Sequence, residues 1–125
     1  MASSVPDRAI DPQAVSTAAA KMPTPSEERR MARVLEGLCD ATRVKIVRAL
    51  SADNTLAAGD LAQVIGRSRS ATSQHLKVLR DIGAVSARRE GNVVRYSLTA
   101  DVSAQVLESA TAALDGLRAS AEAAE

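Results

Sequence analysis

The sequence predicts one small domain that is mainly α-helical and carries a single β-hairpin. Helix start and stop signals recur over residues 24–82, apolar residues alternate with polar ones after Gly83, and helical apolar spacing returns over residues 100–117. At 125 residues and 46% hydrophobic content, the chain can form one core. We therefore expect a domain over residues 24–117, between a disordered tail of residues 1–23 and a frayed C-terminus of residues 118–125.

The composition indicates what kind of core this protein has and in which compartment it works. With one Tyr, no Phe and no Trp, the core must be aliphatic, and such a small core gains stability from a second subunit. The single Cys excludes an internal disulfide framework and indicates a reducing compartment. No apolar run approaches the roughly 20 residues that span a bilayer, and the N-terminus lacks a secretory pattern. We expect a cytoplasmic protein with no membrane partner.

The chain before residue 66 predicts three helices. Prolines interrupt the first 23 residues, where only a transient helix near residues 13–21 is expected. Thr24, followed by Pro25 and Glu27, is a helix start with a capping box, and this helix should run to about residue 38. Asp40 caps a second helix that ends near residue 50. After a polar connection over residues 51–55, a third helix covers residues 58–65 and ends at Gly66.

The next helix should run over residues 69–82, with Ser68 as its N-cap and Gly83 just past its end. At 100° per residue its side chains divide into two arcs. The packing arc holds Ala71, Thr72, Leu76, Val78, Leu79 and Ile82. The opposite arc holds Ser70, Ser73, Gln74, Lys77, Arg80 and Asp81. Its short hydroxyl and amide side chains are of the kind that reads base edges, although an ordinary amphipathic helix has the same two arcs.

A Gly91-Asn92 dipeptide between two alternating runs predicts a hairpin with a two-residue turn. Counting outward from the turn pairs Glu90 with Val93, Val85 with Leu98, Ala87 with Tyr96, and Arg88 with Arg95. Facing arginines repel, and an anion between them would remove that cost. We interpret Arg88 and Arg95, with Arg89 nearby, as a phosphate clamp; the alternative is a solvated hairpin tip.

Positive charge is concentrated on this helix and hairpin. Residues 67–95 carry a net charge of +5, whereas the whole chain carries +1. The distribution is typical of a nucleic-acid-binding surface. We expect phosphate contacts from Arg67, Ser68, Arg69, Lys77, Arg80, Arg88, Arg89 and Arg95. We expect base contacts from Ser70, Ser73, Gln74 and His75, where His75 is alternatively a structural side chain bonded to neighbouring backbone.

Several motifs occur together between residues 30 and 117. They are Leu38, Asp40-Ala-Thr-Arg43, Leu50, Leu61-Ala62, Ile65-Gly66, Ser68, Ser70, Ser73-Gln-His-Leu-Lys-Val-Leu-Arg80, Gly83, Val85 and Tyr96-Ser-Leu98. In this combination the chain resembles the ArsR/SmtB family of winged helix-turn-helix repressors. The resemblance implies a homodimer that binds double-stranded operator DNA, with residues 69–82 as the reading helix and the hairpin as the wing.

Many members of that family sense metals, and the resemblance implies where ligands would lie. The thiolate pair would fall near Ala57 and Gly59, which have no donor atom. The ligands of the last helix would fall on Asp101, Ser103, Leu114 and Leu117, of which only the Asp suits a metal. We therefore expect no metal site and no cofactor of the familiar kinds. Cys39 is interpreted as a small packing residue, with a redox sensor as the alternative.

The last helix predicts the dimer interface. Apolar residues recur at helical spacing over residues 100–117, and a monomer with so few elements has little to cover them. The expected interface residues are Val102, Val106, Ala110, Leu114 and Leu117. No nucleophile pair, phosphate-cradling glycine loop or carboxylate cluster indicates an enzyme.

The predicted function is therefore a dimeric transcriptional repressor that binds an imperfect inverted repeat and responds to an unknown inducer or partner protein. One alternative is a metal- or redox-responsive repressor with an atypical site. Another, from a different class, is a winged-helix module that binds an acidic protein.

Overall fold

The computed structural model describes residues 8–124, which form six helices and three strands. The chain divides into two units, residues 1–30 and 31–125, and each is considered by itself. In the part of the chain that the structure describes, no helix is both long and apolar enough to cross a membrane. The predicted fold class, mainly α with a β-hairpin wing, is confirmed.

The first unit contains helix α1 (Pro12–Ala19) and the start of α2 (Pro25–Glu36). The sequence analysis expected a transient helix near residues 13–21, and α1 covers most of that range. It was wrong only in counting Pro12 among the prolines that interrupt a helix. Pro12 begins α1, where a proline lacks only an N–H that has no helical partner, and the Asp11 carboxylate accepts a bond of 3.0 Å from the Ala14 N–H. At α2, Thr24 and Glu27 form the predicted capping box over 3.2 and 3.4 Å.

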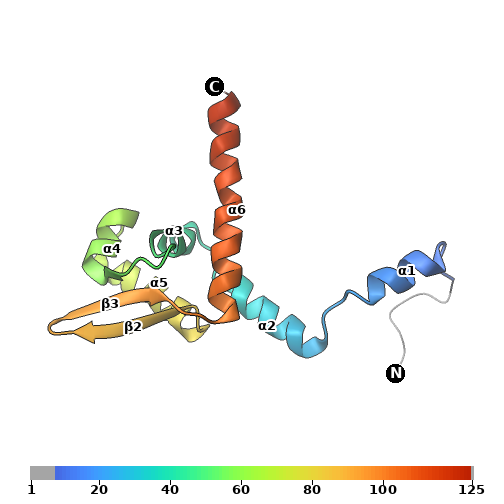
Figure 1. Ribbon diagram of the computed structural model, residues 1–125, viewed down its shortest axis with the longest axis horizontal. Coiled ribbons are helices and arrows are strands. Elements are labelled where there is room, and N and C mark those ends of the chain that lie inside the picture. The colour runs from blue at the N-terminus through green and yellow to red at the C-terminus, as the bar shows by residue number, and fades with distance from the viewer. Residues whose placement is uncertain (1–7, 125) are drawn as a thin grey trace. The chain divides into compact units, whose positions relative to one another are not determined.

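The second unit follows the predicted order closely. After α2 come α3 (Ala41–Ala49), α4 (Ala58–Ile65), α5 (Arg69–Asp81), the strands β2 (Val85–Glu90) and β3 (Val93–Leu98), and α6 (Val102–Ala124) (Figure 1). A two-residue strand β1 (Leu56–Ala57) pairs with β3 and was not predicted, because two residues are too few to show alternation. Helix α6 continues past Leu117, at which we expected the chain to fray.

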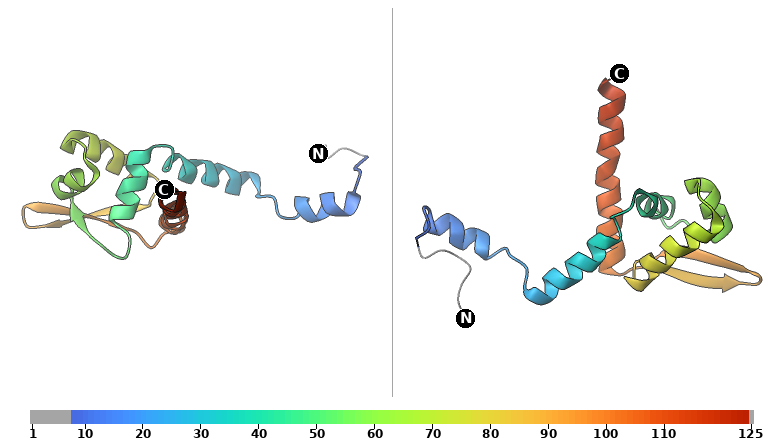
Figure 2. Two further views of the ribbon diagram at one scale, coloured as in Figure 1. Left: turned by 90° about the horizontal axis from the view of Figure 1, so that it is seen from above. Right: turned by 180° about the vertical axis from the view of Figure 1, so that it is seen from behind.

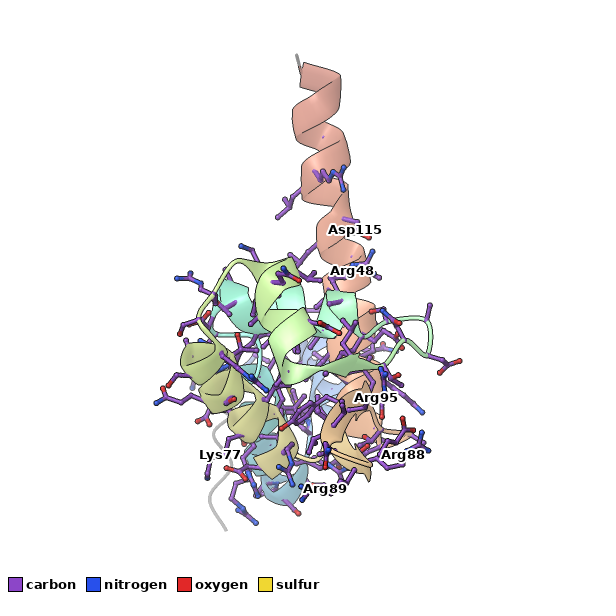
Figure 3. The ribbon with its side chains drawn as sticks, turned by 90° about the vertical axis from the view of Figure 1, so that its left-hand side faces the viewer. Arg48, Lys77, Arg88, Arg89, Arg95 and Asp115 are labelled. Carbon is purple, nitrogen blue, oxygen red and sulfur yellow. The ribbon has the colours of Figure 1, made fainter. Side chains whose placement is uncertain are left out.

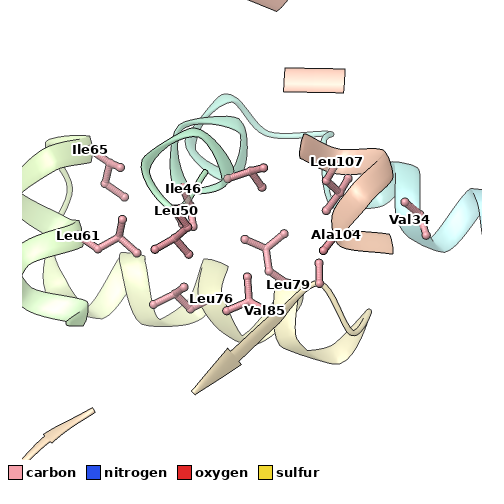
Figure 4. Packing of buried hydrophobic residues seen from close by; sticks show 12 residues of the cluster. Val34, Ile46, Leu50, Leu61, Ile65, Leu76, Leu79, Val85, Ala104 and Leu107 are labelled. Atoms are coloured by element: carbon pink, nitrogen blue, oxygen red, sulfur yellow. The ribbon is translucent and has the colours of Figure 1, made fainter. Parts of the chain in front are cut away.

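One aliphatic core holds the second unit together. It gathers side chains from α2, α3, α4, α5, β2 and α6, and its centre is fully buried around Ile46, Leu61 and Leu79 (Figure 4). Every residue of the predicted packing arc of α5 is buried or half-buried, and every residue of the opposite arc is exposed. The core therefore fixes which face of α5 is turned to solvent.

The antiparallel sheet has the strand order β1-β3-β2. Its β2–β3 register agrees with all four predicted pairs, including Arg88 opposite Arg95. Gly91 opens the turn with φ of 61°, a left-handed conformation that favours glycine. The hairpin lies beside α5 and points away from the core (Figure 2).

Candidate nucleic-acid interface

The outer face of α5 presents polar side chains in a fixed orientation. Ser68 caps the helix by accepting a bond of 3.0 Å from the Ala71 N–H, and the buried Thr72 hydroxyl donates 2.8 Å to the Ser68 carbonyl. These bonds set where the helix begins, and Leu76 and Leu79 anchor its inner face in the core. The helix is therefore a rigid support for its exposed side chains.

Three side chains predicted to read bases lie on that outer face. Ser70, Ser73 and Gln74 are all exposed. None of them hydrogen-bonds another group within residues 8–124. Their hydroxyl and amide groups are thus available for hydrogen bonds to the edges of bases. Among the bases, the Gln amide favours adenine.

His75 differs from its neighbours. It is half-buried, and its Nδ1 accepts a hydrogen bond of 3.3 Å from Nε of Arg43 on α3. The structural interpretation of His75 named neighbouring backbone as its partner, and this is wrong. The actual partner is a side chain 32 residues away, which no local pattern could indicate.

The basic residues of α5 and the turn before it fall into two groups. Arg67, Arg69 and Arg80 are exposed and form no ion pair in the described residues. Lys77 pairs with Asp81 one helical turn away, over 3.3 Å. Exposed pairs of this kind contribute little to stability, so Lys77 can exchange Asp81 for another anion.

The wing contains an anion of its own. The Glu90 carboxylate accepts from Nη2 of Arg88 through one oxygen and from Nε of Arg95 over 3.1 Å through the other. The sequence analysis expected an anion between the facing arginines, and in the free chain the Glu90 carboxylate is that anion. The interpretation of Arg88 and Arg95 as a phosphate clamp stays a prediction. Glu90 follows Arg88 by two residues, so both project from the same face of the hairpin.

The three wing arginines are also divided between two faces. Arg89 is paired with Val94, and alternation along the strand places it on the opposite face from Arg88 and Arg95. In Figure 3, Arg89 lies on the side of the wing nearer to Lys77. Of the three arginines in the predicted phosphate clamp, Arg88 and Arg95 therefore share one face of the hairpin, and Arg89 lies on the other face.

A groove of about 610 Å³ separates α5 from the wing. It is lined by both base-reading and phosphate-binding candidates, together with residues at the start of α4. The lining includes Ala57, Gly59, Asp60, Arg69, Ser73, Arg95 and Tyr96. Arg69 lies close to Gly59, where an added Cβ atom would be 3.8 Å from the guanidinium carbon.

The expected dimer residues lie on an exposed strip of α6. Val102, Val106, Leu114 and Leu117 are 42–69% exposed, and Ala110 is half-buried. Leu107, which shares their spacing, is instead fully buried with Ala104 in the core. On α2, Met31 and Leu35 are about half exposed. The monomer thus leaves apolar surface uncovered on two helices.

Cys39 is exposed, and its Sγ lies 3.5 Å from the Leu35 carbonyl oxygen. The interpretation as a packing residue is therefore wrong. At the positions implied for metal ligands, Ala57 and Gly59 line the groove, and Ser103 is buried in the first turn of α6. Among residues 8–124, no three His, Cys, Asp or Glu side chains are grouped so that they could hold a metal.

Comparison with known proteins points to one family. Residues 40–87 match the model of the bacterial regulatory proteins of the arsR family. The cadmium resistance transcriptional regulatory protein CadC homolog of Staphylococcus aureus is 39% identical over 80 residues, which is 64% of this chain and 66%, just under two thirds, of that protein. The regulator YgaV of Escherichia coli is 36% identical over 67 residues, 54% of this chain and 68% of that protein.

Solved structures agree with these matches. HlyU from Vibrio cholerae superposes with a TM-score of 0.64 at 29% identity, covering 75% of this chain and 97% of that one. The relatives are transcriptional regulators, as expected for a chain that is not an enzyme.

Proposed function

The chain belongs to the ArsR family of transcriptional regulators, and we propose that it is a homodimeric repressor that binds a specific operator in double-stranded DNA. Residues 24–117 form the domain in this proposal. The observation that carries it is the outer face of α5, where Ser70, Ser73 and Gln74 lie between arginines and, within residues 8–124, the three side chains form no hydrogen bond and the arginines no ion pair. Such an arrangement suits base contacts flanked by phosphate contacts.

The roles of the side chains follow from their chemistry. Ser70, Ser73 and Gln74 contact base edges in the major groove. Arg67, Arg69, Lys77 and Arg80 contact phosphates beside them, and Arg88, Arg89 and Arg95 extend these contacts along the flanking backbone. Ser68 contributes through its place at the N-terminus of α5, where N–H groups favour an anion.

Two subunits bind together in this proposal. The exposed strip on α6 and the exposed Met31 and Leu35 of α2 supply apolar surface for a symmetric interface. Two α5 helices would then enter successive major grooves about 34 to 36 Å apart on an imperfect inverted repeat. Repression follows from occlusion of a promoter, and an inducer or partner protein would act by changing the angle between the two helices.

The signal that releases the DNA is a separate question. The name of the S. aureus relative refers to cadmium resistance. Thiolate ligands at Ala57 and Gly59 are ruled out by the residue types alone. We propose that this repressor responds to something other than a metal held at those two positions.

The direct test is to select duplexes from random genomic fragments with the purified protein and to sequence what is bound. The proposal expects an inverted repeat with half-sites one helical turn apart. Binding should also weaken steeply with salt. If about four phosphates are neutralised per subunit, about eight in the dimer, the slope of log affinity on log salt is about −7. Equal binding of every fragment, or binding of an acidic protein in place of DNA, would refute it.

A further inference from the structure

Glu90 lies between Arg88 and Arg95, two of the wing arginines that the proposed function assigns to DNA phosphates. It is the last residue of β2, and it shares one face of the hairpin with Arg88 and Arg95, which are cross-strand partners. Its two carboxylate oxygens are divided between them, Oε1 with Nη2 of Arg88 and Oε2 with Nε of Arg95 at 3.1 Å. A single carboxylate therefore bridges the pair.

This arrangement lowers the electrostatic repulsion within the hairpin. Two guanidinium groups opposite each other on adjacent strands repel, and a carboxylate between them neutralises part of that repulsion. The three side chains together carry a charge of +1, whereas the arginines alone would carry +2. The free wing is thus less positive than its arginines suggest.

A DNA phosphate needs the same N–H groups. Carboxylate and phosphate oxygens both accept from guanidinium groups with similar geometry. The Arg88 side chain is 77% exposed and those of Glu90 and Arg95 are 43% and 41% exposed, so water and phosphate reach the bridge. Exposed ion pairs are weak, which allows exchange of one anion for another.

We propose that Glu90 is a built-in competitor of the DNA backbone and that it limits sequence-independent binding. A phosphate reaches Arg88 and Arg95 only when it displaces the carboxylate. Because the wing then contributes less affinity on any duplex, a larger share of binding depends on the base contacts of α5. The inference rests on the proposed function, and it makes Glu90 a residue that tunes specificity without itself touching a base.

The test compares wild type with Glu90→Gln on a labelled random-sequence duplex over a range of KCl concentrations. The amide keeps the size of the side chain and removes its charge. At low salt the variant should bind roughly three- to tenfold more tightly. Its slope of log affinity on log salt should be steeper by about 0.9 per subunit, since one more phosphate is neutralised.

Two controls separate the bridge from a general effect of charge. Glu28→Gln removes one negative charge from α2, where Glu28 forms no ion pair in the described residues, and it should leave affinity nearly unchanged. In a double variant that carries Arg88→Gln and Arg95→Gln, adding Glu90→Gln should no longer increase the affinity for the duplex. A gain that persists without the two arginines would overturn the inference.

A second measurement needs no DNA. Sulfate, compared with chloride at equal ionic strength, should raise the Tm of Glu90→Gln more than that of wild type, because sulfate can replace the missing carboxylate. Equal affinities and equal sulfate responses would overturn the inference while leaving the proposed function intact. Failure of wild type to bind any duplex would instead refute the proposed function, and the sulfate comparison would still decide whether Glu90 and an oxyanion share the two arginines.

Discussion

Arg43 donates a hydrogen bond of 3.3 Å from Nε to Nδ1 of His75, and its Nη1 donates 2.7 Å to the carbonyl of Glu36. One guanidinium thereby joins α3 to α5 and to the C-terminal end of α2. Because α2 carries part of the exposed apolar surface and α5 carries the candidate base contacts, Arg43 connects the proposed dimer interface to the proposed DNA-binding helix.

A double-mutant cycle measures this link. Arg43→Ala should lower the free energy of unfolding by about 1 kcal/mol, because it removes hydrogen bonds to His75 and Glu36. His75→Ala should cost less after Arg43→Ala than before it, with a coupling of about 0.5–1.5 kcal/mol. Urea denaturation at one protein concentration gives these values, and strictly additive effects would show that the 3.3 Å bond contributes nothing.

Asp40 should make stability depend on acid pH. Its carboxylate accepts a bond of 2.6 Å from the Thr42 N–H at the start of α3, and this bond lowers the pKa of Asp40. A carboxyl group whose pKa is lower in the folded chain stabilises the fold above its unfolded pKa, and this stabilisation is lost as pH falls through the folded value. The window therefore lies below the ordinary pKa of 3.8.

Asp40→Asn is the matched variant, since Asn also caps helices but does not titrate. The difference in urea midpoint between wild type and Asp40→Asn should shrink as the pH is lowered from neutral to below the ordinary pKa of 3.8. A difference that stays constant over that range would mean that the Asp40 cap does not depend on its charge.

Gln74→Ala and Arg80→Ala should affect DNA binding in different ways. Loss of the Gln74 amide should relax the preference at one base pair, by about 1–3 kcal/mol of discrimination, while binding of other duplexes changes little. Loss of Arg80 should weaken all duplexes alike and make the salt slope shallower by about 0.9 per subunit. If each variant lowers affinity equally for every duplex, the two side chains have the same role and the assignment fails.

Leu114→Asp should dissociate the dimer. Leu114 is 42% exposed on the strip of α6, and a carboxylate there would be desolvated in an interface. Val64→Asp is the control, because Val64 is 65% exposed on α4, away from that strip. Sedimentation velocity should find wild type and Val64→Asp as dimers and Leu114→Asp as a monomer. A wild type that sediments as a monomer would contradict the proposed interface.

The local features were predictable because short-range chemistry determines them. Ser68, Gly66 and Gly83 begin or end helices as expected, and the turn at Gly91 sets the register of the whole hairpin. The face of α5 that meets solvent also followed from its 3.6-residue period. These properties depend on residues within a few positions of one another, so a single sequence contains them.

Other features arise only when distant segments meet. The partner of His75 is 32 residues away, and β1 exists only because β3 lies beside it. On α6, the buried face includes Ser103 and Thr111, whose polar side chains concealed it from a search for apolar spacing. The carboxylate of Glu90 turned out to lie between two arginines whose pairing was predicted correctly. The sequence alone thus determined the main helices and strands of this protein and the register of its hairpin. Tertiary packing decided the partners of its charged and polar side chains, because those interactions depend on distances in space that spacing along the chain does not specify.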